Sequence, residues 1–361
     1  MSFSEQASSA PEASGGPIPL LSSSSGDNAG EEGGKASIPS ARATTTASKE
    51  APPKVTMEAV PSGFKLISPP GDDDDEFDVQ DVLSDSCSDM HFEKISWGGV
   101  KNEIARQIVQ ILKEFEDVFS EQVSSVPCTL EPYKIVLKKG VVFPPKAMLQ
   151  NVRPQTAMNE AFIKEKLKKW LDLGVIKKAT SRYWSQVHIV NKAGKSPRFC
   201  IDWRALNALV ELFQYPIPDI KKTLSKLKNH KFYATIDLTD AYTQVLTDAS
   251  SVEYTAFRVL DDIYVMARLG FGHSGAVAHF QKEIATKVLD GLIGECCYNY
   301  LDDIIFWGDT EAEFLDNLRK ILGRLRRYVV KAKMSKLQFG NAITVLGHQI
   351  NKMGMCYRIL Q

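Results

Sequence analysis

The sequence lacks the features of several protein classes. No apolar run approaches the roughly 20 residues that cross a bilayer, and the start, Met1–Glu5, has neither the basic nor the apolar region of a signal peptide. The six cysteines form no CxxC pair and no zinc-like spacing, and the neighbours Cys296 and Cys297 are poorly placed to bond to each other. These absences indicate no membrane association and a reducing intracellular setting, the cytoplasm or the nucleus.

The net charge is zero over 361 residues, but the charges are unevenly distributed. Residues 1–95 contain 6 Lys and Arg against 17 Asp and Glu, a net of −11, so the remainder carries +11. Residues 1–95 are also rich in Ser, Ala, Gly and Pro, and we expect this acidic region to be disordered because it cannot bury enough apolar surface. The basic remainder fits a polyanionic partner, although ordinary surface solubility also explains such a charge.

The most informative segment is Tyr300–Asp303, where two adjacent carboxylates stand between two apolar runs. This pattern predicts a tight β-hairpin with Asp302 and Asp303 at its tip. A third acid, Asp237, ends the β-rich run Lys231–Leu238. Each acid taken alone is explained by a turn or a helix cap. Together, however, three carboxylates have the chemistry of a Mg²⁺ site for two-metal phosphoryl transfer, since unpaired carboxylates repel each other unless a cation neutralises them.

Apolar periodicity gives a coarse secondary structure. Strands are expected over Gln186–Asn191 and Arg198–Asp202, joined by a Gly- and Pro-containing hairpin loop. Helical spacing of apolar residues predicts four longer helices, over residues 100–119, 157–173, 276–292 and 311–328. Helices and strands alternate without βαβ regularity, which indicates the α+β class.

The order of these motifs resembles the reverse transcriptase of LTR retroelements, most closely the gypsy type. The resemblance covers roughly Glu103 to Met355, in family order and with family-like gaps, which is not expected by chance. The matching segments are Leu173–Ile176, Ser181–Ser185, Arg198–Asn207, Tyr215–Pro218, Ile236–Leu238 with Ala241–Tyr242, Thr255–Arg258, Phe271–Gly272, Phe280–Gln281, Tyr300–Asp303, Lys333–Phe339 and Leu346–His348.

The resemblance implies an α+β fold with a right-hand polymerase palm, an antiparallel sheet backed by helices, and a fingers extension. It divides the chain into the disordered acidic region 1–95, a linker with an amphipathic helix over 96–155, and fingers and palm over 156–361. The thumb, connection and ribonuclease H regions of the family are expected to be absent, and no protease or integrase motif is found. The chain therefore resembles a piece of a Pol polyprotein, or a degenerate copy of one.

The function that the resemblance implies is an RNA-directed DNA polymerase, which adds deoxynucleotides to a primer 3′-end by two-metal phosphoryl transfer. Its partners would be an RNA or DNA template with a primer, deoxynucleoside triphosphates, and two Mg²⁺ ions for which Mn²⁺ can substitute. One alternative is a truncated retroelement remnant that binds nucleic acid without polymerising. Another is a different palm enzyme, such as an RNA-dependent RNA polymerase, although Tyr242 and Arg198–Asn207 argue against it.

The resemblance also assigns roles to single residues. The catalytic and metal-binding residues would be Asp237, Asp302 and Asp303. The nucleotide-binding residues would be Lys192, Arg198, Tyr242, Phe271 and Gly272. The template and primer contacts would be Arg204, Asn207, Gly347 and His348.

Further details follow from the same resemblance. Tyr242 would be the aromatic gate that clashes with a ribose 2′-hydroxyl, and Lys336 is a candidate proton donor to the departing pyrophosphate. Gln281 is expected on a helix surface or beside the template. Gly270 and Val277 stand where the family usually has Pro, so the nucleotide pocket is expected to differ in shape.

Overall fold

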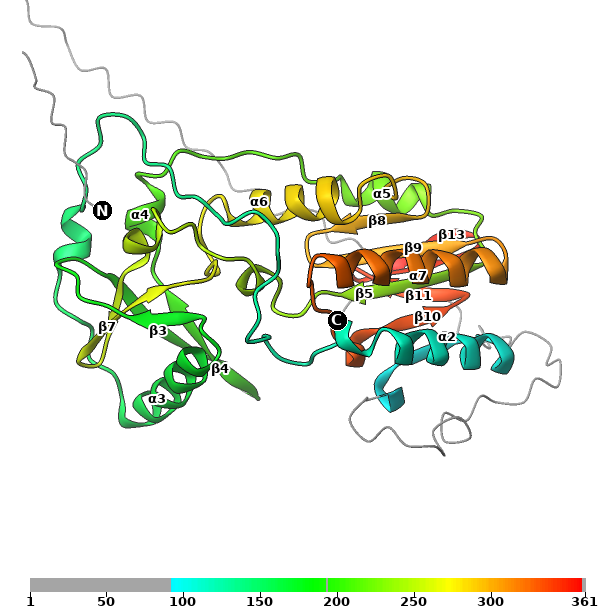
Figure 1. The fold of residues 1–361 in the computed structure, drawn as a ribbon, viewed down its shortest axis with the longest axis horizontal. Coiled ribbons are helices and arrows are strands. Elements are labelled where there is room, and N and C mark those ends of the chain that lie inside the picture. Colours follow the sequence, from blue (N-terminus) through cyan, green and yellow to red (C-terminus); the bar gives the residue numbers. More distant parts are fainter. Residues whose placement is uncertain (1–91, 193, 359–361) are drawn as a thin grey trace, which may run out of the picture. The chain divides into compact units, whose positions relative to one another are not determined.

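The centre of the fold is a five-stranded sheet in which β5 (Phe232–Asp237) and β9 (Asp303–Gly308) are antiparallel neighbours. It has the order β1-β10-β5-β9-β8, and we call it the palm sheet (Figure 1). The structure is a computed structural model that describes residues 92–192 and 194–358, all within the compact unit Ser68–Gln361. Residues 1–91, most of the region expected to be disordered, lie outside the described part.

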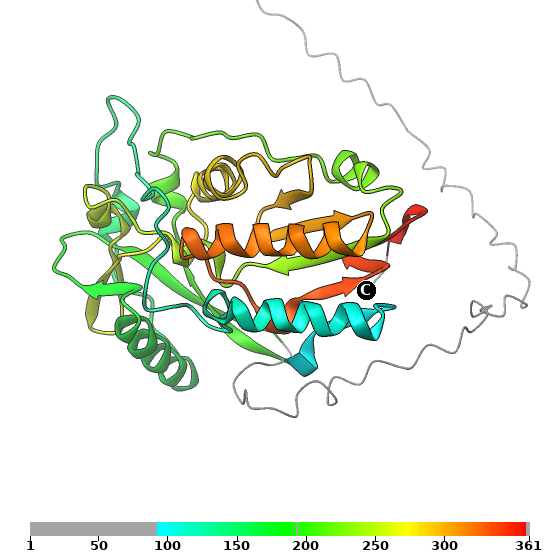
Figure 2. The same ribbon diagram turned by 45° about the vertical axis from the view of Figure 1, so that its right-hand side comes forward.

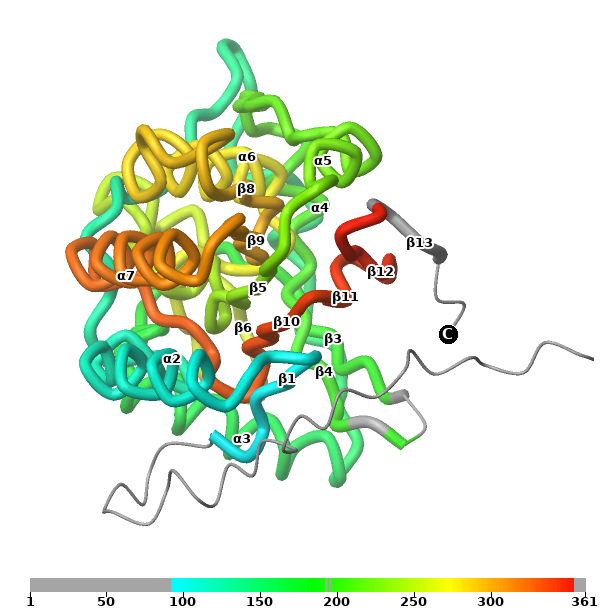
Figure 3. Tube along the Cα trace, turned by 90° about the vertical axis from the view of Figure 1, so that its right-hand side faces the viewer, coloured from blue at the N-terminus to red at the C-terminus, as the bar shows by residue number. Residues whose placement is uncertain are grey.

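Both faces of the palm sheet are buried, which explains why its central strands have near-continuous apolar sequences. Along β9, Ile304 and Phe306 belong to the main hydrophobic core beneath the helices. The alternate residues Ile305 and Trp307 belong to a second core on the other face. Figure 3 shows this division, with α2, α6 and α7 on one side of the sheet and β11–β13 on the other.

Two further sheets complete the strands. The sheet β2-β7-β6-β3-β4, which we call the fingers sheet, is the predicted fingers extension, and the small sheet β11-β12-β13 packs through the second core. The remaining strands are β1 (Ser96–Gly98), β2 (Ile176–Lys178), β3 (Ser185–Lys192), β4 (Lys195–Ile201), β6 (Phe257–Val259), β7 (Asp262–Met266), β8 (Cys297–Tyr300), β10 (Gln338–Gly340), β11 (Ala342–Val345), β12 (His348–Asn351) and β13 (Gly354–Arg358).

The described α-helices include the four predicted ones, although the one predicted over 100–119 ends at Glu114, and two short helices that were not predicted. Their bounds are α2 (Asn102–Glu114), α3 (Ala157–Asp172), α4 (Arg204–Asn207), α5 (Ile220–Lys226), α6 (Ala276–Glu283) and α7 (Glu311–Arg327). Thr156 and Thr310 explain where α3 and α7 begin, because each side chain accepts a hydrogen bond from the backbone three residues later. The helix predicted over 276–292 is shorter, since α6 passes into a π-helical turn over Ile284–Val288. No described helix is long and apolar enough to span a membrane.

Helices α2 and α7 lie side by side over one face of the palm sheet (Figures 1 and 2). The apolar stripe of α2 is buried, including Ile104, Ile108 and Leu112 at helical spacing. Helix α7 packs on β9 and buries Phe314, whose ring stacks on Phe306 at 5.1 Å. The α+β class and the palm architecture predicted from the sequence are confirmed.

Arg268 is a buried cation that joins separate parts of the chain. Its side chain is 2 % exposed, and its guanidinium donates hydrogen bonds only to backbone carbonyls. The acceptors are the carbonyl oxygens of Ser124 at 2.7 Å, Ser125 at 2.5 Å, Leu173 at 3.0 Å and Thr243 at 3.4 Å. They belong to the segment before the fingers, the end of α3 and the turn after β5, so one fork ties these elements together.

We expect Arg268→Leu to lower the free energy of unfolding by about 3 kcal/mol or more, because four backbone carbonyls, buried or partly buried, lose a charged donor. Urea unfolding followed by circular dichroism measures the change. The matched control is Arg319→Leu on α7, where the arginine pairs with Glu114 at the surface. An exposed pair contributes less than about 1 kcal/mol. Equal effects of the two substitutions would contradict the structural role of Arg268.

Candidate active site

The three predicted carboxylates come together at adjacent ends of β5 and β9. Asp237 is the last residue of β5, and its Cα lies in register with that of Asp303, the first residue of β9. Asp302 occupies the turn before β9, and its carbonyl oxygen accepts a hydrogen bond from Leu238 N at 2.8 Å. The register of two buried strands therefore brings together acids that are more than 60 residues apart in the sequence.

The predicted hairpin is present, with β8 and β9 joined by Leu301 and Asp302. Leu301 adopts φ +57°, a left-handed conformation that a leucine rarely takes. Gln281 supports it, because its Oε1 accepts from Leu301 N at 2.8 Å while its Nε2 donates to Asn299 Oδ1 at 2.6 Å. Asn299 Nδ2 in turn donates to the carbonyl oxygen of Leu301 at 3.2 Å.

The contacts of Gln281 with Asn299 and Leu301 were not predicted from the sequence. Gln281 is 1 % exposed, so the expectation that it lies on a helix surface or beside the template is wrong. Asn299, at 2 % exposed, carries the one signal that was available: an amide inside an otherwise apolar strand needs a buried partner. The two amides satisfy each other and fix the turn that carries Asp302.

Lys336 provides the positive charge nearest to the acids. Its Nζ lies 2.6 Å from Asp237 Oδ2, and the Asp237 side chain is only 13 % exposed. The backbone holds the lysine in place, since Lys333 N donates to the carbonyl oxygen of Asp237 at 2.9 Å just before the turn Met334–Lys336. The carboxylates raise the pKa of Lys336 against the opposing effect of its burial.

Asp303 has the most perturbed carboxyl of the group. Burial, together with the charges of Asp302 and Asp237, raises its pKa from 3.8 to about 6, although the nearby charge of Lys336 lowers it. A single lysine therefore does not compensate three neighbouring carboxylates. Excess negative charge of this kind, on hard oxygen donors, fits a divalent cation such as Mg²⁺.

The three carboxylates have suitable chemistry for a divalent cation, but they do not form a preformed set of ligands. Across residues 92–192 and 194–358, no three His, Cys, Asp or Glu side chains stand in an arrangement that would hold a metal ion. In this structure Lys336 takes up one oxygen of Asp237. Metal binding would therefore require the Lys336–Asp237 ion pair to rearrange.

An aromatic group lies next to the acids. Tyr242 is half-buried in the 3₁₀ turn Ala241–Gln244, edge-on to Phe271 at 5.3 Å and to Phe280 at 5.5 Å. Burial raises the pKa of Tyr242, and the charge of Asp302 raises it further, which places the tyrosine near that carboxylate. Phe271 is 55 % exposed, so its ring offers an apolar surface beside Tyr242.

The predicted fingers residues lie on the hairpin of β3 and β4. Lys192 is the last residue of β3, and Arg198 is an exposed residue of β4 that pairs in register with Val190. Arg204, the first residue of α4, is exposed and donates two hydrogen bonds to the carboxylate of Asp202, at 2.8 and 2.6 Å. Within the part of the chain that the structure describes, no hydrogen bond or ion pair joins Arg198 or Arg204 to the three carboxylates.

Asn207 does not simply face outward. Its Nδ2 donates to the carbonyl oxygen of Gly272 at 2.8 Å, and its Oδ1 accepts from Ser274 N at 3.1 Å. Gly272 adopts φ +92°, which favours glycine. The structure therefore joins a predicted template residue to a predicted nucleotide-pocket residue.

Gly347 and His348 lie on the small sheet, which packs against the palm sheet through the second core (Figure 3). Leu346 and Gly347 form the two-residue turn between β11 and β12, with φ values of +50° and +75°. Two positive φ values match the primed turns that tight hairpins favour. His348 begins β12, and its Nδ1 is buried without a hydrogen-bond partner.

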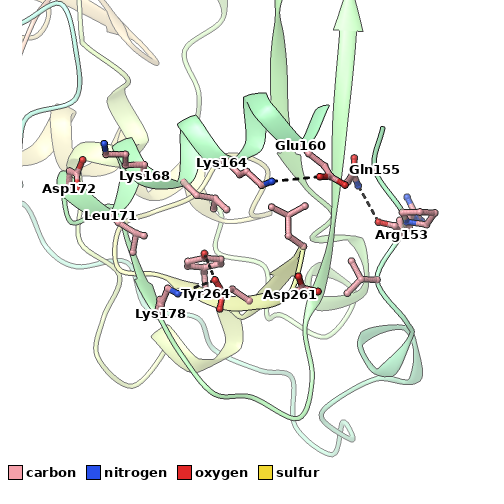
Figure 4. Close-up of a pocket in the computed structure, with 15 residues that line it drawn as sticks. Arg153, Gln155, Glu160, Lys164, Lys168, Leu171, Asp172, Lys178, Asp261 and Tyr264 are labelled. Carbon is pink, nitrogen blue, oxygen red and sulfur yellow. Dashed lines mark hydrogen bonds and ion pairs between the residues drawn. The ribbon is translucent and has the colours of Figure 1, made fainter. Parts of the chain in front are cut away.

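A cavity of about 690 Å³ lies away from these residues, between α3 and the turn that joins β6 to β7 (Figure 4). Charges of both signs line it, and several are already paired, as Lys178 with Asp262 and Lys164 with Glu160. None of the predicted site residues lines it. The candidate active site is therefore the carboxylate cluster and not this cavity.

The carboxylate cluster lies in a region of the chain whose sequence is similar to known proteins. Residues 190–350 match the family model described as reverse transcriptase (RNA-dependent DNA polymerase). The chain is 33% identical over 199 residues to the retrovirus-related Pol polyprotein from transposon opus of Drosophila melanogaster, covering 54% of this chain and 20% of that protein. It is 30% identical over 200 residues to the Pol polyprotein from transposon gypsy of the same species, covering 54% and 19%. The chain thus spans about a fifth of these relatives.

The fold is also similar to solved structures. A foamy viral protease-reverse transcriptase in complex with double-stranded DNA matches with a TM-score of 0.64 and 24% identity, covering 73% of this chain and 45% of that one. A second structure of that protein, in complex with an RNA/DNA hybrid, matches with a TM-score of 0.63 and 23% identity, covering 73% and 34%. At this identity the likeness concerns the fold. Together with the match of residues 190–350 to the family model, it leads to one conclusion: this chain is similar to the reverse transcriptases of LTR-retrotransposon Pol polyproteins.

Proposed function

We propose that this chain is an RNA-directed DNA polymerase that adds deoxynucleotides to a primer 3′-end on an RNA or DNA template. The observation that supports it most is the meeting of Asp237, Asp302 and Asp303 at adjacent strand ends within a reverse transcriptase domain. The foamy viral structures are complexes with double-stranded DNA and with an RNA/DNA hybrid, which supports nucleic acid as the partner of this chain.

The reaction joins the primer 3′-oxygen to the α-phosphorus of a deoxynucleoside triphosphate, releases pyrophosphate, and frees the hydroxyl proton. Asp237 and Asp302 would hold two Mg²⁺ or Mn²⁺ ions, with Asp303 close by. Such ions, when bound, activate the attacking hydroxyl and neutralise charge on the transferring phosphorus group. The mutual repulsion of the three carboxylates, which raises the pKa of Asp303, favours this cation binding.

Other residues would bind and orient the substrates. Lys192 and Arg198 would hold the triphosphate, arginine as a bidentate fork and lysine as a point charge. Lys336, beside Asp237, is the candidate proton donor to pyrophosphate. Arg204, Asn207, Gly347 and His348 would contact the template and the primer.

We expect Asp237→Asn and Asp302→Asn each to reduce primer extension on an RNA template by more than about a hundredfold, since metal-ion stabilisation supplies several kcal/mol. Primer–template binding should persist, because contacts to phosphates supply most of the affinity. Gel-resolved extension with Mg²⁺ and then Mn²⁺ measures activity, and filter binding measures affinity.

Asp309→Asn is the matched control for these variants. This acid follows the other end of β9 and pairs with His230, away from the cluster. Near-native extension by either site variant would refute the assignment. A wild-type chain that binds primer–template but never extends it would favour the remnant that binds nucleic acid without polymerising.

A second prediction concerns stability and pH in the presence of a chelator. The folded pKa of Asp303 is about 6, against the ordinary value of 3.8 that applies to the unfolded chain, so the folded state binds this proton more tightly. Its stabilising effect is complete below pH 3.8 and is lost as pH rises through about 6. We expect Asp303→Asn to remove this loss and to raise the free energy of unfolding at pH 8 by roughly 1–2 kcal/mol.

Urea unfolding at pH 4 and pH 8 measures this difference. Asp316→Asn is the control, because Asp316 is exposed on α7 and pairs with Lys320. Added Mg²⁺ should raise the Tm of the wild type more at pH 8 than at pH 5, since carboxylates must lose their protons to hold the ion. If Asp303→Asn gave the same gain at both pH values, the carboxyl of Asp303 would not be the titrating group.

A third prediction concerns the choice of sugar. We expect Tyr242→Val to raise the use of ribonucleotides relative to deoxynucleotides by about tenfold or more, because the ring no longer clashes with a 2′-hydroxyl. The ratio of kcat/KM for a ribonucleotide and its deoxynucleotide measures this preference. Tyr242→Phe keeps the ring and should keep the preference. An unchanged ratio in Tyr242→Val would remove this residue from the sugar pocket.

A further inference from the structure

One short segment of the fingers holds the loop that carries Phe271. Trp203 and Asn207 stand at either end of α4, and both reach the loop Gly270–Ser274. Trp203 Nε1 donates to the carbonyl oxygen of Phe271 at 2.9 Å. Asn207 binds the next carbonyl, that of Gly272, and the amide of Ser274. Three polar groups of one loop are thus fixed by two side chains.

Ring packing adds a fourth attachment. Trp203 is 2 % exposed and stacks on His273, with ring centroids 4.2 Å apart and planes at 25°. Burial lowers the pKa of His273 to about 4, so this stack joins two neutral rings near pH 7. Gly272 fits the arrangement because a Cβ there would lie 3.3 Å from Trp203 Cδ1.

The backbone of this loop is anchored while its largest side chain is not covered. Phe271 is 55 % exposed, although both carbonyl groups beside it are bound. The exposed ring stands edge-on to Tyr242, the proposed sugar gate. An apolar ring held on a fixed backbone at the edge of a site is the arrangement of a preorganised binding surface.

We propose that Asn207 is a positioning residue for the incoming nucleotide, which acts through Phe271 and Tyr242, rather than a contact to the template strand. This inference rests on the proposed polymerase function. Both ends of the Asn207 amide are already used within the protein, on Gly272 and Ser274. Helix α4 also follows closely after β4, the strand that carries Arg198. The chain from Arg198 to Asn207 would therefore support both the phosphate side and the sugar side of the proposed nucleotide pocket.

Asn207→Leu tests this role, because it removes donor and acceptor at nearly constant size. We expect the KM for deoxynucleotide to rise about five- to tenfold, the loss of roughly one net hydrogen bond. The Kd for primer–template should change less than about twofold, and the preference for deoxynucleotide over ribonucleotide should fall, because the Phe271 ring is no longer fixed against Tyr242.

Asn341→Leu is the matched control. Its amide also donates to a glycine carbonyl, that of Gly99 at 3.0 Å, but at the edge of the palm sheet. It should leave the KM for nucleotide unchanged. Asn207→Asp is a second variant, which keeps the acceptor for Ser274 N but replaces the donor to Gly272 with a charged oxygen that repels its carbonyl group. Thermal unfolding establishes that each variant is folded.

A double-mutant cycle with Phe271→Ala separates positioning from template contact. If Asn207 acts through Phe271, Asn207→Leu should add less than about a twofold effect on the nucleotide KM once the ring is gone. A raised Kd for primer–template, or a full effect of Asn207→Leu in the Phe271→Ala background, would overturn the proposal and return Asn207 to the template strand.

A binding measurement keeps this test distinct from the test of the polymerase function. The Kd of a deoxynucleoside triphosphate for the complex with a dideoxy-terminated primer reports nucleotide affinity without turnover. A wild-type chain that neither extends a primer nor binds nucleotide would refute the proposed function. A wild-type chain that does both, with unchanged nucleotide affinity in Asn207→Leu, would refute only the role of Asn207.

Discussion

The pairing of β5 with β9 is the constraint on which the site depends. Both strands are apolar on both faces, so their register is fixed by two separate cores. That register forces Asp237 opposite Asp303, with Asp302 next to both. Burying a carboxylate beside like charges is unfavourable, and the pKa of Asp303 is raised by its burial and by the charges of Asp302 and Asp237. The stability of the apolar sheet thus holds in place an arrangement that the carboxylates alone would not adopt.

The surrounding polar groups each support a different part of this arrangement. Gln281 and Asn299 pair with each other and hold Leu301 in a left-handed conformation, which directs the chain into Asp302. Lys336 partly neutralises Asp237 from a segment whose backbone also bonds to that residue. Arg268 ties the segment before the fingers, α3 and the turn after β5 to one another through carbonyl groups. Each of these polar groups joins chain segments that are distant in the sequence and must keep a fixed relation.

Much of this fold could be predicted from the sequence, and the limits have physical causes. Amphipathic periodicity located α2, α3 and α7, and the acids between apolar runs located the β8–β9 hairpin. The end of α6 was missed because its apolar spacing continues while the backbone passes into a π-turn. The hydrogen bonds of Gln281 and Asn207 could not be predicted, because an amide on a helix carries no sign of its partner. Their hydrogen bonds reach chain segments 20 and more than 60 residues away.

The loop Gly270–Ser274 is restrained by side chains of another chain segment. The sequence departs from the family at Gly270 and Val277, where proline would restrict the backbone. In this chain the restriction comes instead from side chains, through Trp203 on Phe271 and His273 and through Asn207 on Gly272 and Ser274. A Cβ at Gly270 would meet Met266 at 3.4 Å, an ordinary contact distance, so packing does not demand glycine there. The loop is therefore held by the segment Trp203–Asn207 rather than by its own backbone, which links the shape of the proposed nucleotide pocket to that segment.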